Sequence, residues 1–259
     1  MKLALIIPAH NEEKRIGKTL EAYSEFLEKI REKEEFDYEM IIVINNTHDD
    51  TEGVIKPFVK KNKRISYVNL EKGGKGYALT EGFKLSIKKN VDYIGFVDAD
   101  MATIPEELWK LMDVRGYDGA VASRYEKRSK IFPKQSFRTA IVGRIFNLIV
   151  RIIFMINYRD TQCGAKIFKK KVIEKILPEL KMSSWAYDVN LLYSCNINEF
   201  RIASIPTVWY EIEGGSLKVG KSSIQMLLSI VQLRIIRSPF RRLLSPLKPI
   251  SKFLWRITQ

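Results

Sequence analysis

Three short polar segments each follow an apolar run, and their residue types suit the binding of a phosphorylated ligand. Asp98 and Asp100 supply two carboxylates, which are ligands that Mg²⁺ and Mn²⁺ prefer. Residues 73–76 (GGKG) join glycine backbone, which can approach a phosphate closely, to the charge of Lys75. Residues 8–12 (PAHNE) are the third segment. Together they predict a site for a divalent cation and a diphosphate.

Each segment also has a purely structural interpretation. Aspartates after a strand are typical of turns that their side chains stabilise. Residues 73–76 could be an ordinary glycine-rich turn, and Asn11 could cap the next helix. A nucleoside-triphosphate loop of the Walker type is excluded, because Gly76 follows Lys75 where that loop has Ser or Thr.

The elements that must position these segments alternate between strands and helices. Continuous Val, Ile and Leu runs predict buried strands of a mainly parallel sheet that helices cover on both faces. Ligands of such sheets bind at the carboxyl ends of the strands, where the three segments lie. The expected strands are 2–8, 38–45, 64–70, 93–98, 118–123 and strands within 201–212; the expected helices are 12–34, 74–89, 137–157, 186–195 and 224–237.

The charge of the chain is concentrated in two segments. The 259 residues carry 44 basic and 30 acidic side chains, a formal charge of +14. Residues 127–159 hold eight basic residues and 214–259 hold nine, with no acid in either, so the rest carries 14 − 17 = −3. Such segments are typical of contact with phosphates, nucleic acid or an anionic membrane. A solvated basic face is the structural alternative.

Composition excludes several classes of protein. The two cysteines, Cys163 and Cys195, cannot form a disulfide framework or a four-cysteine zinc site, and they favour a reducing cytoplasm. The apolar run at the N-terminus stops at Pro8, too early for a secretory signal. No apolar stretch is long enough to predict a membrane span.

With these segments in order, the sequence resembles glycosyltransferase family 2, which has the GT-A fold. The Pro-Ala-x-Asn-Glu opening, the Gly-Lys-Gly loop and the Asp-x-Asp motif stand at residues 8–12, 74–76 and 98–100. Further segments resemble the lipid-phosphate branch that includes dolichyl-phosphate β-glucosyltransferases and dolichyl-phosphate mannose synthases. They are DADMAT (98–103), SR (123–124), FRT (137–139), DTQCGAK (160–166), WAYDV (185–189) and WYEIEG (209–214).

The resemblance implies an inverting transfer of a sugar to a polyprenyl phosphate, with UDP-glucose as the expected donor. It places the nucleotide sugar against Pro8, Ala9, Glu12, Asn45, Lys75, Asp98, Ala99 and Asp100. Asp98 and Asp100 would hold Mg²⁺ or Mn²⁺. Arg124 and Arg138 would bind the acceptor phosphate, and Asp188 is the third catalytic residue, with its role left open.

One departure bears on the donor. The family usually has Asp where this chain has Asn45, at the position that contacts the base. An amide can pair with uracil N3–H and O4, whereas guanine offers mainly donors, so the departure favours UDP over GDP. A GDP-mannose or other UDP-sugar donor and a glycan hydroxyl acceptor remain alternatives.

The basic residues of the C-terminal segment have an expected role of their own. We expect a catalytic domain over residues 1–213 and a basic amphipathic tail over 214–259 that attaches the enzyme peripherally to the cytoplasmic face of a membrane. A nucleic-acid-binding protein is the alternative of another class, but the basic segments are rich in aliphatic residues and poor in aromatic ones, so we expect no nucleic acid partner. A nucleotidyltransferase, which would release pyrophosphate, is a third interpretation.

Overall fold

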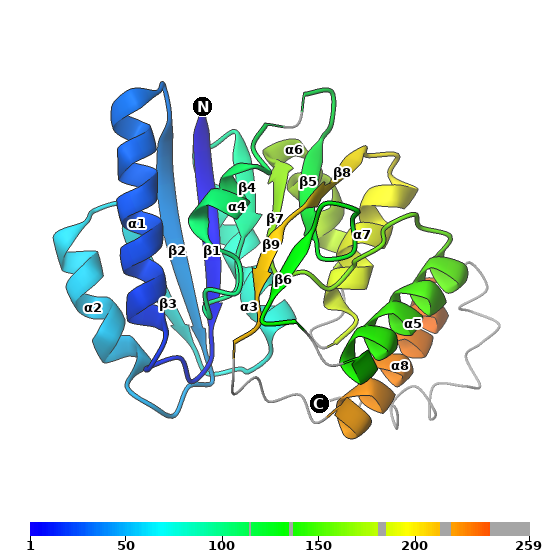
Figure 1. Cartoon of the computed structure of the whole chain (residues 1–259). Coiled ribbons are helices and arrows are strands. Elements are labelled where there is room, and N and C mark those ends of the chain that lie inside the picture. The colour runs from blue at the N-terminus through cyan, green and yellow to red at the C-terminus, as the bar shows by residue number, and fades with distance from the viewer. Residues whose placement is uncertain (114, 135–136, 181–184, 213–218, 239–259) are drawn as a thin grey trace.

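Runs of aliphatic residues form the seven strands of one central sheet (Figure 1). A computed structural model describes residues 1–113, 115–134, 137–180, 185–212 and 219–238. The strand order in the sheet is β3-β2-β1-β4-β7-β5-β8. The strands are β1 (Lys2–Ala9), β2 (Asp37–Asn45), β3 (Ile65–Leu70), β4 (Tyr93–Phe96), β5 (Gly119–Ser123), β7 (Lys166–Lys169) and β8 (Ile202–Pro206), and a separate pair contains β6 (Lys130–Phe132) and β9 (Val208–Tyr210).

One strand of the central sheet runs against the others. β7 pairs antiparallel with β4 and with β5, whereas every other pairing in the sheet is parallel. The carboxyl ends of β1, β2, β4 and β5 therefore share an edge with the amino end of β7. The prediction of a mainly parallel sheet is confirmed.

Helices cover both faces of the sheet, as expected. Side chains of β1 alternate between two buried clusters, with Leu3 and Leu5 on one face and Ala4 and Ile6 on the other. The helices are α1 (Ile16–Lys33), α2 (Thr51–Lys61), α3 (Lys75–Ser86), α4 (Pro105–Trp109), α5 (Phe137–Phe154), α6 (Lys170–Ile176), α7 (Tyr187–Ile197) and α8 (Val219–Ile236), with a short 3₁₀ helix at Leu177–Glu179.

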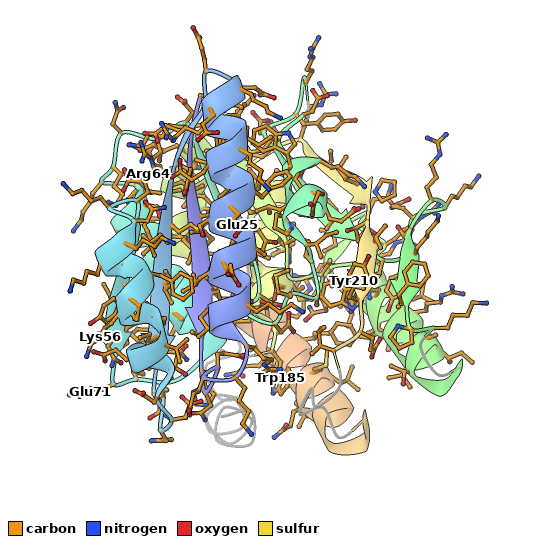
Figure 2. All side chains as sticks on the ribbon, turned by 60° about the vertical axis from the view of Figure 1, so that its left-hand side comes forward. Glu25, Lys56, Arg64, Glu71, Trp185 and Tyr210 are labelled. Carbon is orange, nitrogen blue, oxygen red and sulfur yellow. The ribbon has the colours of Figure 1, made fainter. Side chains whose placement is uncertain are left out.

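The first face carries helices from the N-terminal half. α1 packs on it through Leu20 and Tyr23, beside α2 and α4. Glu25 on α1 and Lys56 on α2 point outward from the sheet (Figure 2). The opposite face carries α3, α5, α6, α7 and α8. This arrangement leaves the strand edges as the places where polar side chains gather.

Several elements differ from expectation, among them α4, α6 and β6, which lie in no expected range. Helix α2 was not expected, since Gly53 and Pro57 within it disfavour a helix; Asp50 caps it by accepting a hydrogen bond from the Gly53 N–H at 3.1 Å. β7 was not expected as a strand, because it is four residues long and has a lysine at each end. Strand β4 ends at Phe96, so Asp98 lies beyond it.

The last described helix packs into the core. Ile230 and Leu233 of α8 are fully buried, and α8 contacts α5. Arg237 follows α8 and pairs with Glu179 at 2.6 Å. The first part of the segment expected as a tail therefore belongs to the hydrophobic core of the sheet; residues 214–218 and 239–259 lie outside the described residues. None of the described helices is long and apolar enough to cross a membrane.

Candidate functional site at the carboxyl edge of the sheet

The ends of three neighbouring strands bring the expected donor residues to one edge. Pro8 and Ala9 are the last residues of β1, and Ala9 lies in register with Ile44 of β2. Asn45 ends β2. The strand order places β1 between β2 and β4, so that the Asp98–Asp100 segment after β4 lies at the same edge.

The side chain of Asn45 connects two of these segments. Only 2% of the residue is exposed. With its amide oriented to satisfy its neighbours, the nitrogen donates to Ala9 O at 2.9 Å and the oxygen accepts from the Gly74 N–H at 3.0 Å. The amide groups expected to contact a base are thus engaged with backbone, and Asn45 joins the end of β1 to the glycine loop.

The segment after β1 is held by the loop after β2. Asn11 has a positive φ of 55°, and its Oδ1 accepts a hydrogen bond from the His48 N–H at 2.8 Å. The interpretation of Asn11 as a helix cap is wrong, because α1 begins at Ile16 with Arg15 at the cap position. His10 Nδ1 lies 2.9 Å from Asn45 O. Residues 8–12 thereby form one wall of the candidate site.

Lys75, the first residue of α3, lies over the Asp-x-Asp segment. Its ammonium is 2.5 Å from Asp98 Oδ1, and the Lys75 side chain keeps 40% of its surface exposed. Burial acts to lower the pKa of Lys75, but the charges of Asp98 and Asp188 hold that pKa above its ordinary value. Lys75 is therefore a cation that pairs with Asp98 and is stabilised further by the charge of Asp188.

The other acidic side chains at this edge, Asp100 and Glu12, have less positive charge near them than burial and the neighbouring acids would require. Burial, together with the charge of Asp98, raises the pKa of Asp100. Burial also raises the pKa of Glu12; Arg15, which pairs with it at 2.7 Å, opposes the rise, while the charges of Asp100 and Asp98 add to it. Negative charge at this edge thus exceeds what the neighbouring cations neutralise.

These acids fit a site for a divalent cation that takes its other ligands from a bound diphosphate and from water. Among the described residues, no group of three or more His, Cys, Asp or Glu side chains is arranged to hold a metal ion. Mg²⁺ commonly takes one or two carboxylates and completes its shell with water and substrate phosphates. The raised pKa of Asp100 is a further sign that this edge favours a cation.

The loop before β7 enters the site from the other side. An added Cβ at Gly164 would lie 2.0 Å from Asp98 Oδ2, so only glycine leaves that carboxylate its place. Asn147 of α5 holds the same loop by accepting hydrogen bonds from the Thr161 N–H at 2.8 Å and the Thr161 hydroxyl at 3.0 Å. The backbone of residues 161–164 therefore joins α5 to the Asp-x-Asp segment.

Arg124 follows β5 and is bound to a fully buried carboxylate. Its Nε donates to Asp160 Oδ2 at 2.7 Å and its Nη2 to Oδ1 at 2.9 Å, a bidentate pair. Burial acts to raise the pKa of Asp160, but the attraction of Arg124 and its hydrogen bonds hold that pKa below its ordinary value. The guanidinium also lies over the ring of Trp209, 5.0 Å from its centroid. Arg124 Nη1 makes no hydrogen bond to any described residue.

The two other expected catalytic residues have different positions. Asp188 lies in the first turn of α7, 10% of its side chain is exposed, and its Oδ1 is 2.5 Å from Lys166 Nζ. Arg138 is in the first turn of α5, and its side chain lies outside the described part of the structure. The structure thus brings Asp188 close to Lys75, and it leaves the placement of Arg138 untested.

Three residues of this site have no individual role in the sequence-based prediction: Asp160, Gly164 and Lys166. All three belong to residues 160–166, which carried the family resemblance without individual roles. A lysine in a strand with apolar neighbours, such as Lys166, is a signal of a buried pair, but it does not identify the partner.

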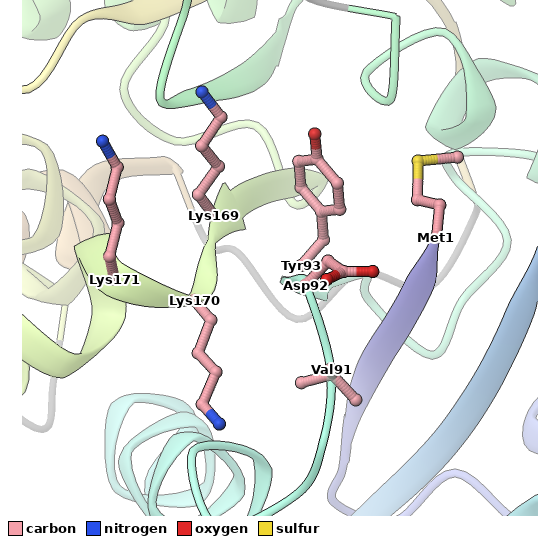
Figure 3. A pocket seen from close by; sticks show the side chains of 7 residues that line it. All are labelled: Met1, Val91, Asp92, Tyr93, Lys169, Lys170 and Lys171. Carbon is pink, nitrogen blue, oxygen red and sulfur yellow. The ribbon is translucent and has the colours of Figure 1, made fainter.

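A hollow at the opposite edge of the sheet is separate from this site (Figure 3). It lies at the amino end of β4, beside Asp92 and Lys169–Lys171. Lys170 points away from the other two lysines and donates to Lys89 O at 2.7 Å, whereas Lys171 pairs with Asp118 at 2.8 Å. These lysines are engaged in holding the strand ends together.

Comparison with known proteins agrees with the geometry. The pattern of glycosyl transferase family 2 matches residues 4–177. A dolichyl-phosphate beta-glucosyltransferase from Dictyostelium discoideum is 32% identical over 243 residues, which cover 90% of this chain and 73% of that protein. The human protein of the same name is 30% identical over 248 residues, with 90% and 75% covered.

A solved structure shares the fold. Glucosyl-3-phosphoglycerate synthase from Mycobacterium tuberculosis, in complex with Mn²⁺, UDP-glucose and phosphoglyceric acid, matches with a TM-score of 0.66. The match covers 92% of this chain and 81% of that chain at 17% identity, so it supports the fold alone.

Proposed function

The chain belongs to glycosyltransferase family 2, and from that premise we propose that it transfers glucose from UDP-glucose to a polyprenyl phosphate of the dolichyl phosphate type. One observation carries the proposal: Lys75, at the carboxyl edge of the sheet, pairs with Asp98 of the expected donor side at 2.5 Å. The charge of Asp188, on the expected acceptor side, also helps to raise the pKa of Lys75. The names of the similar proteins support the lipid-phosphate acceptor and the glucosyl group.

The donor nucleotide lies across the ends of β1, β2 and β4. Pro8, Ala9 and Glu12 form one wall, and Ala99 lies with the Asp-x-Asp segment. Asn45 shapes this surface by fixing Ala9 to Gly74. The amide of Asn45 is engaged with backbone, so it does not favour one base over another. UDP as the nucleotide is supported by the solved structure of the same fold that holds UDP-glucose.

Asp98 and Asp100 would hold the divalent cation, Mg²⁺ or Mn²⁺. When bound, this cation stabilises negative charge on the departing diphosphate. Lys75 contributes a second positive charge at the same place. Because Gly164 leaves Asp98 Oδ2 uncovered, both oxygens of that carboxylate stay in the site.

The acceptor phosphate needs cations more than it needs a base. A phosphate monoester has a second pKa near 6, so it is largely ionised at neutral pH. Arg124 presents Nη1 while Asp160 fixes the rest of the guanidinium. We assign Arg138 to the same phosphate on the family resemblance. Attack opposite the diphosphate inverts the anomeric carbon, so an α-linked donor gives a β-linked product.

A membrane surface supplies this acceptor, and α5 offers a face that fits one. Ile145, Leu148 and Ile152 are 51%, 52% and 68% exposed, and Met155 just after the helix is 87% exposed. Their spacing places them along one side of the helix. With the acid-free basic segment 214–259, this side favours peripheral attachment to an anionic bilayer at the cytoplasmic face.

A panel of radiolabelled nucleotide sugars tests the proposal. The full chain is incubated with polyprenyl phosphate vesicles, Mg²⁺ or Mn²⁺, and UDP-glucose, other UDP-sugars or GDP-mannose. We expect organic-extractable, acid-labile label from UDP-glucose and no release of pyrophosphate. Label from GDP-mannose alone would show that the donor is GDP-mannose and not UDP-glucose. Label only in a water-soluble glycan would refute the lipid-phosphate acceptor.

A further inference from the structure

Lys166 is a charged residue with no exposed surface. It is the first residue of β7, in register with Phe96 of β4 and Val121 of β5. Its Nζ donates to Asp188 Oδ1 at 2.5 Å and to Cys163 O at 2.7 Å, and it lies 5.1 Å from the centre of the Phe96 ring. The ammonium therefore has a fixed place between a loop carbonyl and a carboxylate.

Stability alone is a poor explanation of such a pair. Removing two charges from water costs several kcal/mol per ion, and well-packed apolar residues often replace a buried pair without loss of stability. Lys166 stands on an inner strand of the sheet, between β4 and β5, with its ammonium over the Phe96 ring. The physical effect that an apolar replacement would not reproduce is a fixed orientation of Asp188.

The surroundings of Asp188 give this orientation a use. Asp188 Oδ2 accepts no hydrogen bond from the described residues, so Lys166 holds one oxygen of the carboxylate and leaves the other free. Tyr187, the preceding residue, packs against Gly76, where an added Cβ would lie 2.5 Å from the ring. Asp188 is thereby adjacent to Lys75, whose pKa its charge helps to raise.

We propose that Lys166 is a positioning residue of the transfer reaction: its ammonium, fixed by the Cys163 carbonyl, holds Asp188 Oδ1 so that Oδ2 is presented beside Lys75. The inference rests on the proposed function and adds to it a residue that lies out of reach of solvent. Lys166 and Lys75 are then the two cations that flank Asp188, one from behind and one at the site.

A double-mutant cycle tests the assignment. The variants are Lys166→Met, Asp188→Asn and the two combined, with Lys166→Arg as the conservative change. Lys170→Met is the matched control, because Lys170 also donates to a backbone carbonyl but at the opposite edge of the sheet. Each variant is measured for kcat, for the KM of the nucleotide sugar, and for thermal stability.

We expect Lys166→Met and Asp188→Asn each to lower kcat by about 100-fold, the scale of a misplaced catalytic group, and the combined variant to be no slower than Asp188→Asn. The KM of the nucleotide sugar should change less than about threefold in each variant, because donor binding is untouched. Lys166→Arg should recover part of kcat, and Lys170→Met should keep the wild-type value.

Two results overturn the assignment: a folded Lys166→Met variant with wild-type kcat, or a combined variant about tenfold slower than Asp188→Asn, which would mean that the losses are independent. If Lys166→Met fails to fold, the combined variant is used instead, because it leaves neither member of the pair as an unpaired charge. Its kcat is again compared with that of Asp188→Asn. A wild-type chain that transfers no sugar refutes the proposed function instead, so the two failures are distinguishable.

Discussion

The ammonium of Lys75 lies 2.5 Å from Asp98 Oδ1, so one carboxylate of the Asp-x-Asp segment is already paired with a cation of the chain itself. Among the described residues Asp100 has no such ion pair, and burial, together with the charge of Asp98, raises its pKa. The two aspartates therefore differ in what a divalent cation would give them: it would share Asp98 with Lys75, but it would be the main counter-charge of Asp100.

The Asp100→Ala variant should lose at least about 100-fold of its transfer rate, since charge stabilisation of the leaving group is removed. Vesicle binding should be unchanged, because Asp100 is far in sequence from both basic segments. Initial rates with labelled UDP-glucose and vesicle flotation measure the two effects. Asp113→Ala, at an aspartate with 84% of its side chain exposed, is the control. An active Asp100→Ala variant would remove this residue from the cation site.

Gly164→Ala should lower activity while the protein stays folded. The new methyl group would lie 2.0 Å from Asp98 Oδ2 and must displace that carboxylate. Gly116→Ala is the matched change: nothing lies within 4 Å of its Cβ, but its φ of +76° disfavours alanine. We expect Gly116→Ala to cost about 1 kcal/mol of stability at unchanged kcat. Equal kcat in both variants would argue against a crowded Asp98.

The pair of Arg124 and Asp160 should make stability depend on pH. The pKa of Asp160 is lower in the folded chain than in the unfolded chain. Its ionised form therefore stabilises the fold fully at a pH above the pKa of the unfolded chain, and this stabilisation is lost as the pH falls through the pKa of the folded chain. Asp160→Asn should cost about 3 kcal/mol at pH 7, and this difference should shrink below about pH 4. Urea unfolding at several pH values, with Asp113→Asn as control, measures it. A difference that does not change with pH would contradict the shifted pKa.

Vesicle binding should depend on the exposed side of α5. Ile145→Glu and Ile152→Glu place charges where an apolar surface would meet lipid, and we expect several-fold weaker flotation with anionic vesicles. Ile197→Glu, at a residue 47% exposed at the end of α7, is the matched control. Unfolding temperatures should stay the same, since these positions are exposed. Unchanged flotation in both α5 variants would exclude this side as the membrane contact.

A truncation that tests the tail must end after α8, because α8 packs into the core. Ile230 and Leu233 are fully buried, so removal of residues 214–259 would expose core and confuse binding with unfolding. A chain ending at Ser238 removes residues 239–259 and keeps the pair of Arg237 with Glu179. We expect weaker vesicle binding that falls further with added salt. Full binding by the shortened chain would refute the tail as an attachment.

The grouping of the polar segments after β1, β2 and β4 at one edge was largely predictable, because it depends on order along the chain. Strands β1, β2 and β4 are continuous apolar runs, and the polar residues after them lie where a parallel sheet places them. The acceptor side was less predictable, because it depends on pairs distant in sequence. Arg124 meets Asp160 across 36 residues, and Lys166 meets Asp188 across 22.

The role of Asn45 shows a second limit. Its residue type allowed contact with a base, and only its 2% exposure and its bonds to Ala9 and Gly74 showed the amide to be engaged. Hydrogen-bonding capacity is a property of the side chain, whereas its use depends on which neighbours folding brings within reach. β7 was missed for a related reason, since four residues with lysines at both ends have no strand pattern of their own.

The reversal of β7 decides which connections of the chain carry the residues of the candidate site. Donor residues follow their strands, but residues 160–164 precede theirs, so they enter the same edge on a segment that joins α5 to the sheet. That segment is a separate connection from the turns after β1, β2 and β4, and it meets the turn after β4 where Gly164 lies against Asp98. In the proposed function, the residues that meet the acceptor and those that meet the nucleotide therefore stand on separate connections of the chain, and the contact of Gly164 with Asp98 links the two.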